Sequence, residues 1–63
     1  MSFKAQFRAV VEEFVRVTGH SVDQLARDAG ITPRRATRAL HSRGVLAEDI
    51  AVRIASAMAA RAR

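Results

Sequence analysis

The chain has no cysteine, which excludes a disulfide framework and a thiolate metal site. It also lacks tryptophan and tyrosine, so three phenylalanines are its only aromatic residues. No apolar run approaches the roughly 20 residues that a membrane-spanning helix needs. The first residues do not show the charged, apolar and small-residue regions of a signal peptide. We therefore expect a cytoplasmic protein with no membrane association.

The residue types that carry most enzyme chemistry are also scarce. The two histidines are far apart in the sequence, and the acids occur as the neighbouring pairs Glu12-Glu13 and Glu48-Asp49. Neighbours on a helix point about 100° apart, so neither pair converges on a common point. We expect no enzymatic activity, no metal site, no cofactor and no small-molecule ligand.

Apolar spacing indicates an all-α fold. In a chain of 63 residues it predicts one domain, residues 1–63, near the lower size limit for folding alone. Apolar residues recur at steps of three and four, as on one face of a helix. Ser2, Ser21 and Thr32 are suited to cap helix N-termini, and the three glycines, 19, 30 and 44, fall between the expected helices. The expected helices are 3–17, 21–29, 33–42 and 47–61.

The same spacing predicts which side chains form the core. The first helix has an apolar face of Phe3, Phe7, Val10, Val11, Phe14 and Val17, and the last has one of Ala47, Ile50, Ile54, Ala57 and Met58. We expect six larger side chains to be buried together: Phe7, Phe14, Leu25, Leu40, Ile50 and Ile54. In the last helix, Arg61 and Arg63 are expected to favour the negative end of the helix dipole.

Positive charge is concentrated in the second half of the chain. The whole chain has a net charge of +5. Residues 1–30 contain four basic and four acidic residues, so the excess lies in residues 31–63. Such asymmetry indicates a polyanionic partner.

The expected third helix places its arginines on one side. On a helical wheel, Ala36, Ala39 and Leu40 share one face, and Arg34, Thr37, Arg38 and His41 share the other, with Arg35 and Ser42 flanking them. A solvated polar face is the ordinary interpretation of such a helix. However, no acid lies between Asp28 and Glu48, and a short glycine-containing turn joins the third helix to the second. This arrangement is typical of a helix-turn-helix, whose second helix enters the DNA major groove.

The segment SVDQLARDAGITPRRATRAL resembles the helix-turn-helix of the lambda-repressor and Cro family. LARDAGIT, Arg38 and the later RIASAM are also similar to the lactose-repressor family. The resemblance covers residues 21–58 and implies a lambda-repressor-like domain acting as a small transcriptional regulator. The chain departs from that pattern at Val22, where many members have glutamine, and at Pro33, where a base-reading side chain is common.

Side-chain chemistry assigns roles on this surface. Arg34 and Arg38 are one turn apart, and arginine bonds guanine O6 and N7 in a bidentate manner, so we expect them to contact bases. Arg35 lies at the flank and is expected to hold phosphate. The remaining expected backbone contacts are Ser21, Thr32, Thr37, His41 and Arg43. His41 is equally consistent with an idle surface position, and we expect His20 to be structural or exposed.

Double-stranded DNA is thus the expected partner, with a palindromic operator, a weak homodimer and a nucleoid-associated location. Ala51, Ala55, Ala59 and Ala62 form a strip on the last helix that two copies can share, with the first helix as the alternative if its phenylalanines are exposed. A helix-turn-helix that contacts protein, such as an antirepressor or a polymerase-associated regulator, is the main alternative function. RNA binding is a third, although we expect no exposed aromatic residue for base stacking.

Overall fold

The computed structural model describes residues 2–62, which form four α-helices and no strand. The helices are α1 (Phe3–Thr18), α2 (Val22–Ala29), α3 (Pro33–His41) and α4 (Glu48–Arg61). The all-α prediction is confirmed, and every helix end lies within one residue of its expected position. Arg63, which was expected to favour the end of α4, lies outside the described residues.

The helix ends follow from local hydrogen bonds. Ser21 accepts a hydrogen bond from the backbone N–H of Gln24 at 3.1 Å, and the Gln24 side chain accepts one from the Ser21 N–H at 2.8 Å. These reciprocal bonds satisfy two donors that a helix start otherwise leaves unpaired. Ser2 and Thr32 cap α1 and α3 with a single bond each, and each side chain accepts a backbone N–H at 3.1 Å. The side chain of Ala47 makes no such bond at α4.

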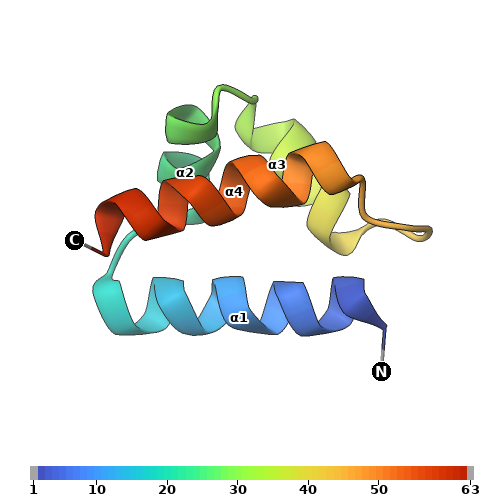
Figure 1. Cartoon of the computed structure of the whole chain (residues 1–63), viewed down its shortest axis with the longest axis horizontal. Coiled ribbons are helices and arrows are strands. Elements are labelled where there is room, and N and C mark those ends of the chain that lie inside the picture. Colours follow the sequence, from blue (N-terminus) through green and yellow to red (C-terminus); the bar gives the residue numbers. More distant parts are fainter. Residues whose placement is uncertain (1, 63) are drawn as a thin grey trace.

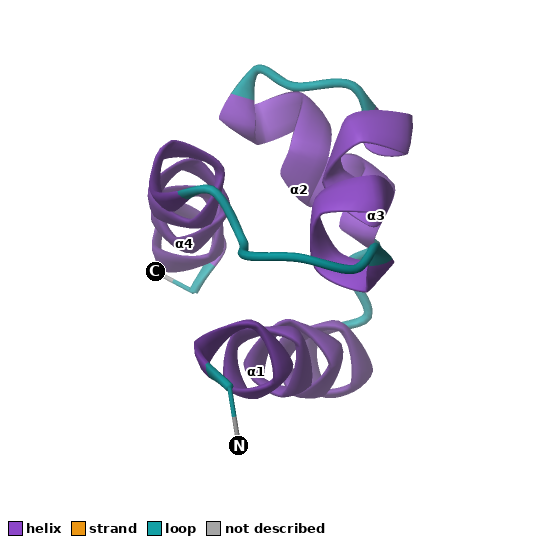
Figure 2. Cartoon of the chain, turned by 90° about the vertical axis from the view of Figure 1, so that its right-hand side faces the viewer, coloured by secondary structure: helices purple, strands orange, loops and turns teal. Residues whose placement is uncertain are grey.

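The four helices surround one apolar core. Figure 1 shows α1 along one side of the molecule, α4 crossing in front, and α2 and α3 behind and above it. Seen along α1 in Figure 2, α4 and α3 lie on opposite sides of the core, and the loop between them spans the gap. The main helix contacts are those of α2 with α3 and α4 and of α1 with α3.

The core is centred on Val11, Leu25, Leu40 and Ile54, the largest fully buried side chains. Four of the six predicted core residues are buried: Leu25, Leu40, Ile50 and Ile54. Phe7 and Phe14 are half-buried and pack against the cluster from its edge. The remaining buried residues are Ala26, Ala36, Leu46, Ala51 and Ala57.

Several predictions about helix faces were wrong. Phe3, Val10 and Val17 were expected to share one apolar face of α1 with Val11, but they are 62%, 56% and 68% exposed. Only Val11 of α1 is buried, because the neighbouring helices cover the side of α1 centred on that residue and leave the flank with Val10 in solvent. Ala51 was expected on an outward strip but is buried, since it lies one position after Ile50 on the covered side of α4. Ala47 is exposed rather than part of the inward face.

Polar side chains connect helices that are distant in sequence. Lys4 of α1 donates hydrogen bonds to the backbone oxygens of Ser42 and Gly44, just beyond the end of α3. The ring of His20 stacks on Phe14, with centroids 6.1 Å apart.

None of the described helices is both long and apolar enough to cross a lipid bilayer.

Candidate nucleic-acid interface

The candidate site is built on α2, a short turn and α3. Gly30 ends α2 with φ of 78°, a left-handed conformation that glycine adopts without steric cost. Ile31 follows, and its N–H donates to the Ala26 oxygen at 3.0 Å. Ala26 and Ala36 are fully buried, so small side chains stand where the two helices meet. The turn therefore fixes the direction in which α3 leaves α2.

The two faces of α3 are separated as the wheel predicted. Ala36 and Leu40 are buried and Ala39 is half-buried against the core. The polar side chains are exposed, namely Arg34, Arg35, Thr37, Arg38 and His41. Two buried side chains thus anchor a nine-residue helix that presents its cations to solvent.

Three of these cations border one shallow cleft. It is lined by Thr32, Arg34, Arg35 and Arg38. Among residues 2–62 none of these arginines takes part in an ion pair. Asp28, the acid that precedes them in sequence, is already paired with Arg61 of α4. The positive charge of this cleft is therefore not compensated within the described part of the chain.

Arg35 differs in position from the other two arginines. It also borders a second hollow, which is lined by Gly30, Ile31, Asp49, Ile50 and Arg53. Arg35 consequently lies between the exposed face of α3 and the start of α4, as expected for a side chain at the flank of the face. Arg34 and Arg38 do not border that hollow.

The hydroxyl groups expected to contact phosphate have a structural task as well. The Ser21 and Thr32 oxygens accept helix-capping hydrogen bonds. A hydroxyl that accepts one bond still has its own hydrogen to donate. Both groups are exposed, so both retain a free donor at a helix start. Thr37 is exposed on α3 itself.

His41 is the last residue of α3, and Arg43 lies in the loop between α3 and α4. Both are exposed. The Lys4 bonds to Ser42 and Gly44 hold the backbone on either side of Arg43. Arg43 is therefore attached to a braced segment.

Two long-range contacts that hold α3 in place were not predicted from the sequence. Arg53 of α4 donates to the Ala29 oxygen at 3.3 Å, and its guanidinium lies beside Gly30, so it braces the turn that directs α3. Lys4 braces the opposite end of α3. The partners are 24 and 38 or 40 positions apart in sequence, and no local pattern signals such pairs.

Val22 occupies the position where the resembled family often has glutamine. It is half-buried and packs against the core. It is followed by Asp23 in the first turn of α2. The N-terminal end of α2 thus presents an acid and the Ser21 hydroxyl rather than an amide side chain.

No group of three or more histidine or acidic side chains suited to a metal ion occurs within residues 2–62. Comparison of the chain with models of known protein families, with curated protein sequences and with solved structures found no match.

Proposed function

We propose that the chain binds double-stranded DNA sequence-specifically, as a small transcriptional regulator with a lambda-repressor-like helix-turn-helix. The observation that carries this proposal is the uncompensated arginine face of α3. Neighbouring arginines repel one another. Their side chains are exposed and gain no packing energy in the core, so the stability of the fold does not explain the cluster. A polyanion supplies the compensating charge.

The shape of α3 suits the major groove. A helix with its side chains is about 10–12 Å across, and the major groove of B-DNA is about 12 Å wide. In this proposal α3 lies in the groove with Arg34 and Arg38 directed at base edges. Pro33, at the first helical position, offers only apolar contact, for instance to a thymine methyl group.

Backbone contacts would come from the periphery of the same surface. Arg35 at the flank, the free hydroxyl hydrogens of Ser21 and Thr32, and Arg43 beyond α3 provide donors for phosphate oxygens. Thr37 and His41 add donors on the face. Because turn and helix end are braced by Arg53 and Lys4, these donors hold their spacing before DNA arrives, which lowers the entropy lost on binding.

Binding to duplexes of random sequence at low and high salt tests the proposal. Each phosphate neutralised by an arginine releases counterions, so affinity should fall steeply with salt. Selection of bound duplexes from the same random pool should then enrich a defined site. Arg34→Ala, which removes a positive charge from α3, should weaken this binding more than the control Arg16→Ala, which removes one exposed positive charge from α1.

The alternative function, a helix-turn-helix that contacts protein, predicts a different result. Such a module has little salt-sensitive affinity for DNA and enriches no sequence. Arg34→Ala and Arg16→Ala would then affect any residual DNA binding equally, since only net charge would matter.

A further inference from the structure

A small polar hollow lies beside the turn between α2 and α3. Charged side chains reach it from two helices, Arg35 from α3 and both Asp49 and Arg53 from α4. Arg35 also lines the cleft on the arginine face, so the hollow continues that surface toward the start of α4. The other residues that line the hollow are Gly30, Ile31 and Ile50.

The hollow has an excess of positive charge. Two guanidinium groups and one carboxylate line it, and within residues 2–62 neither arginine forms an ion pair with Asp49. Asp49 belongs to the first turn of α4, whose backbone dipole adds partial positive charge at that end of the helix. An anion that enters the hollow therefore compensates a charge that the described part of the chain leaves open.

Arg53 is held in position before any ligand arrives. Its Nη1 donates to the Ala29 backbone oxygen at 3.3 Å, which fixes the guanidinium against the end of α2. A guanidinium has five N–H donors, and this bond uses one of them. The remaining donors lie in one plane, in a fork that matches two oxygens of a phosphate group.

We propose that Arg35 and Arg53 together hold one phosphate group of the DNA backbone, and that the Asp49 carboxylate competes with this phosphate for them. This inference rests on the DNA-binding proposal. A strand that follows the flank of α3 meets Arg35 at the edge of the arginine face and then reaches the hollow. No aromatic side chain lines the hollow, so a base has nothing to stack on there, and phosphate is the part of DNA that fits. Arg53 thereby joins the interface as well as bracing the turn.

Asp49 has opposite effects on the free and the bound chain. In the free chain its negative charge offsets the repulsion between the two guanidinium groups. In the complex it repels the phosphate that lies between them. Because phosphates carry no sequence information, Asp49 lowers affinity for every duplex alike and so limits non-specific binding.

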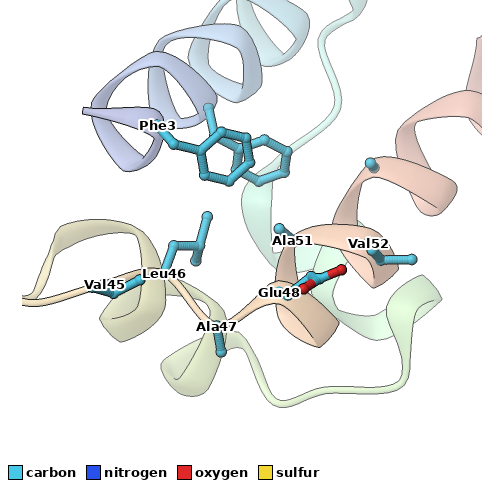
Figure 3. Close-up of a pocket in the computed structure, with 9 residues that line it drawn as sticks. Phe3, Val45, Leu46, Ala47, Glu48, Ala51 and Val52 are labelled. Carbon is cyan, nitrogen blue, oxygen red and sulfur yellow. The ribbon is translucent and has the colours of Figure 1, made fainter. Parts of the chain in front are cut away.

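The neighbouring acid Glu48 provides a matched control for Asp49. Both residues lie in the first turn of α4, so Glu48→Gln and Asp49→Asn remove the same charge from the same helix end. Glu48, however, lines a separate apolar groove that it shares with Phe3 and Leu46, shown in Figure 3. On a scrambled duplex at low salt, Asp49→Asn should bind about fivefold more tightly than Glu48→Gln, because only Asp49 faces the phosphate. Equal affinity of the two variants would mean that net charge alone matters, and would overturn the competition by Asp49.

Salt titrations test whether the two arginines share a phosphate. Arg35→Ala and Arg53→Ala should each lower the slope of log affinity against log salt by about one unit. The double variant should also lose only about one unit, because both side chains serve the same phosphate. A loss of two units in the double variant would assign the arginines to separate phosphates. An unchanged slope in Arg53→Ala, whatever its affinity, would leave Arg53 with a bracing role alone. Either result contradicts the shared site.

Inorganic phosphate tests the hollow without DNA. Titration at constant ionic strength should shift the backbone amide NMR signals of Gly30 and Ile31 in wild type, and should shift them much less in Arg53→Ala. The absence of these shifts in wild type contradicts a phosphate site at the hollow.

These measurements separate the phosphate site from the DNA-binding proposal. If no duplex were bound, but phosphate still shifted the two amides in an Arg53-dependent way, the site would stand and the DNA-binding proposal would fail. If the chain selected a DNA sequence, but neither the salt slope nor the amide shifts responded to Arg53→Ala, the phosphate site would fail and the DNA-binding proposal would stand.

Discussion

Arg61, near the end of α4, forms an ion pair with Asp28, near the end of α2. The hydrogen bond from Arg61 lowers the pKa of Asp28 below its usual value of 3.8, and partial desolvation opposes this without reversing it. A further atom of the guanidinium, Nη1, lies 3.0 Å from Nδ1 of His20. This contact fastens the last turn of α4 to the helix that precedes the turn into α3. Because the Asp28 carboxylate is paired with Arg61, it does not neutralise the arginines of α3.

The first prediction concerns acid sensitivity. The pKa of Asp28 is lower in the folded chain, so its stabilising effect is fully present above pH 3.8 and is lost as the pH falls through the folded pKa. Asp28→Asn should therefore melt at a lower temperature than wild type at neutral pH. The difference should disappear under strongly acidic conditions. Thermal melts followed by circular dichroism across this pH range measure both effects.

Glu13→Gln is the control for that experiment. Glu13 pairs with Arg16 one turn away on the same helix, and both side chains are more than half exposed. Such local exposed pairs contribute little to stability. A melting temperature that fell equally in Glu13→Gln and Asp28→Asn would mean that the tertiary contact has no special effect.

Local features of the fold were predictable from the sequence. Ser21 and Gln24 form a capping box, and Gly30 ends α2, because such patterns depend on residues only a few positions apart. The division of α3 into a buried and an exposed face was also predictable. Its buried positions, Ala36 and Leu40, contrast sharply with the arginines around them.

Features that depend on helix arrangement were not predictable. On α1, nine positions carry apolar side chains, and only the placement of the neighbouring helices decides that Val11 is covered and Val10 is not. Ala51 and Ala55 are the same residue type on the same helix, yet only Ala51 is buried in the fold. The partners Asp28 and Arg61 are 33 positions apart, and a charge pattern alone cannot pair them.

A second prediction concerns the turn. Gly30 has φ of 78°, which costs a residue with a Cβ atom roughly 1–2 kcal/mol. The added Cβ would also lie 3.7 Å from the Arg53 guanidinium, an ordinary contact that adds no clash. Gly30→Ala should therefore destabilise the domain by about 1 kcal/mol, and Gly30→Asn by less, because asparagine tolerates this conformation. Urea unfolding compares the two. An equal or larger loss in Gly30→Asn would show that strain is not the cause.

The third prediction concerns the core. Leu40 and Ile54 are each 1% exposed. Truncating either to alanine removes buried methyl groups and leaves a cavity, which costs about 2–5 kcal/mol. Small domains have a free energy of unfolding of only about 5 kcal/mol or somewhat more, so either variant should be largely unfolded at physiological temperature.

Val10→Ala provides the comparison for the core variants. This valine is 56% exposed and contacts solvent over most of its surface, so its truncation should cost well under 1 kcal/mol. A melting temperature lowered by only a degree or two in Leu40→Ala would contradict the packing described for α3.

The fourth prediction concerns base recognition. Arg34→Ala and Arg38→Ala should each cost about 1–3 kcal/mol on the preferred site, because a bidentate contact to guanine is lost. Each should also relax the base preference at one position of that site. Competition binding against a set of single-base variants measures both. Unchanged affinity and unchanged preference in the two variants would show that neither arginine contacts a base.

The last prediction separates phosphate contacts from base contacts. Arg35 borders both the α3 cleft and the hollow beside Asp49, so it is directed to the edge of the proposed interface. Arg35→Ala should weaken binding to all sequences alike and reduce the slope of log affinity against log salt by about one unit, because one fewer counterion is released. Arg34→Ala should instead change affinity in a sequence-dependent way. Salt titrations on the preferred site and on a scrambled duplex distinguish the two arginines. A sequence-dependent loss in Arg35→Ala would place its guanidinium at a base edge and move the centre of α3 in the groove toward α4.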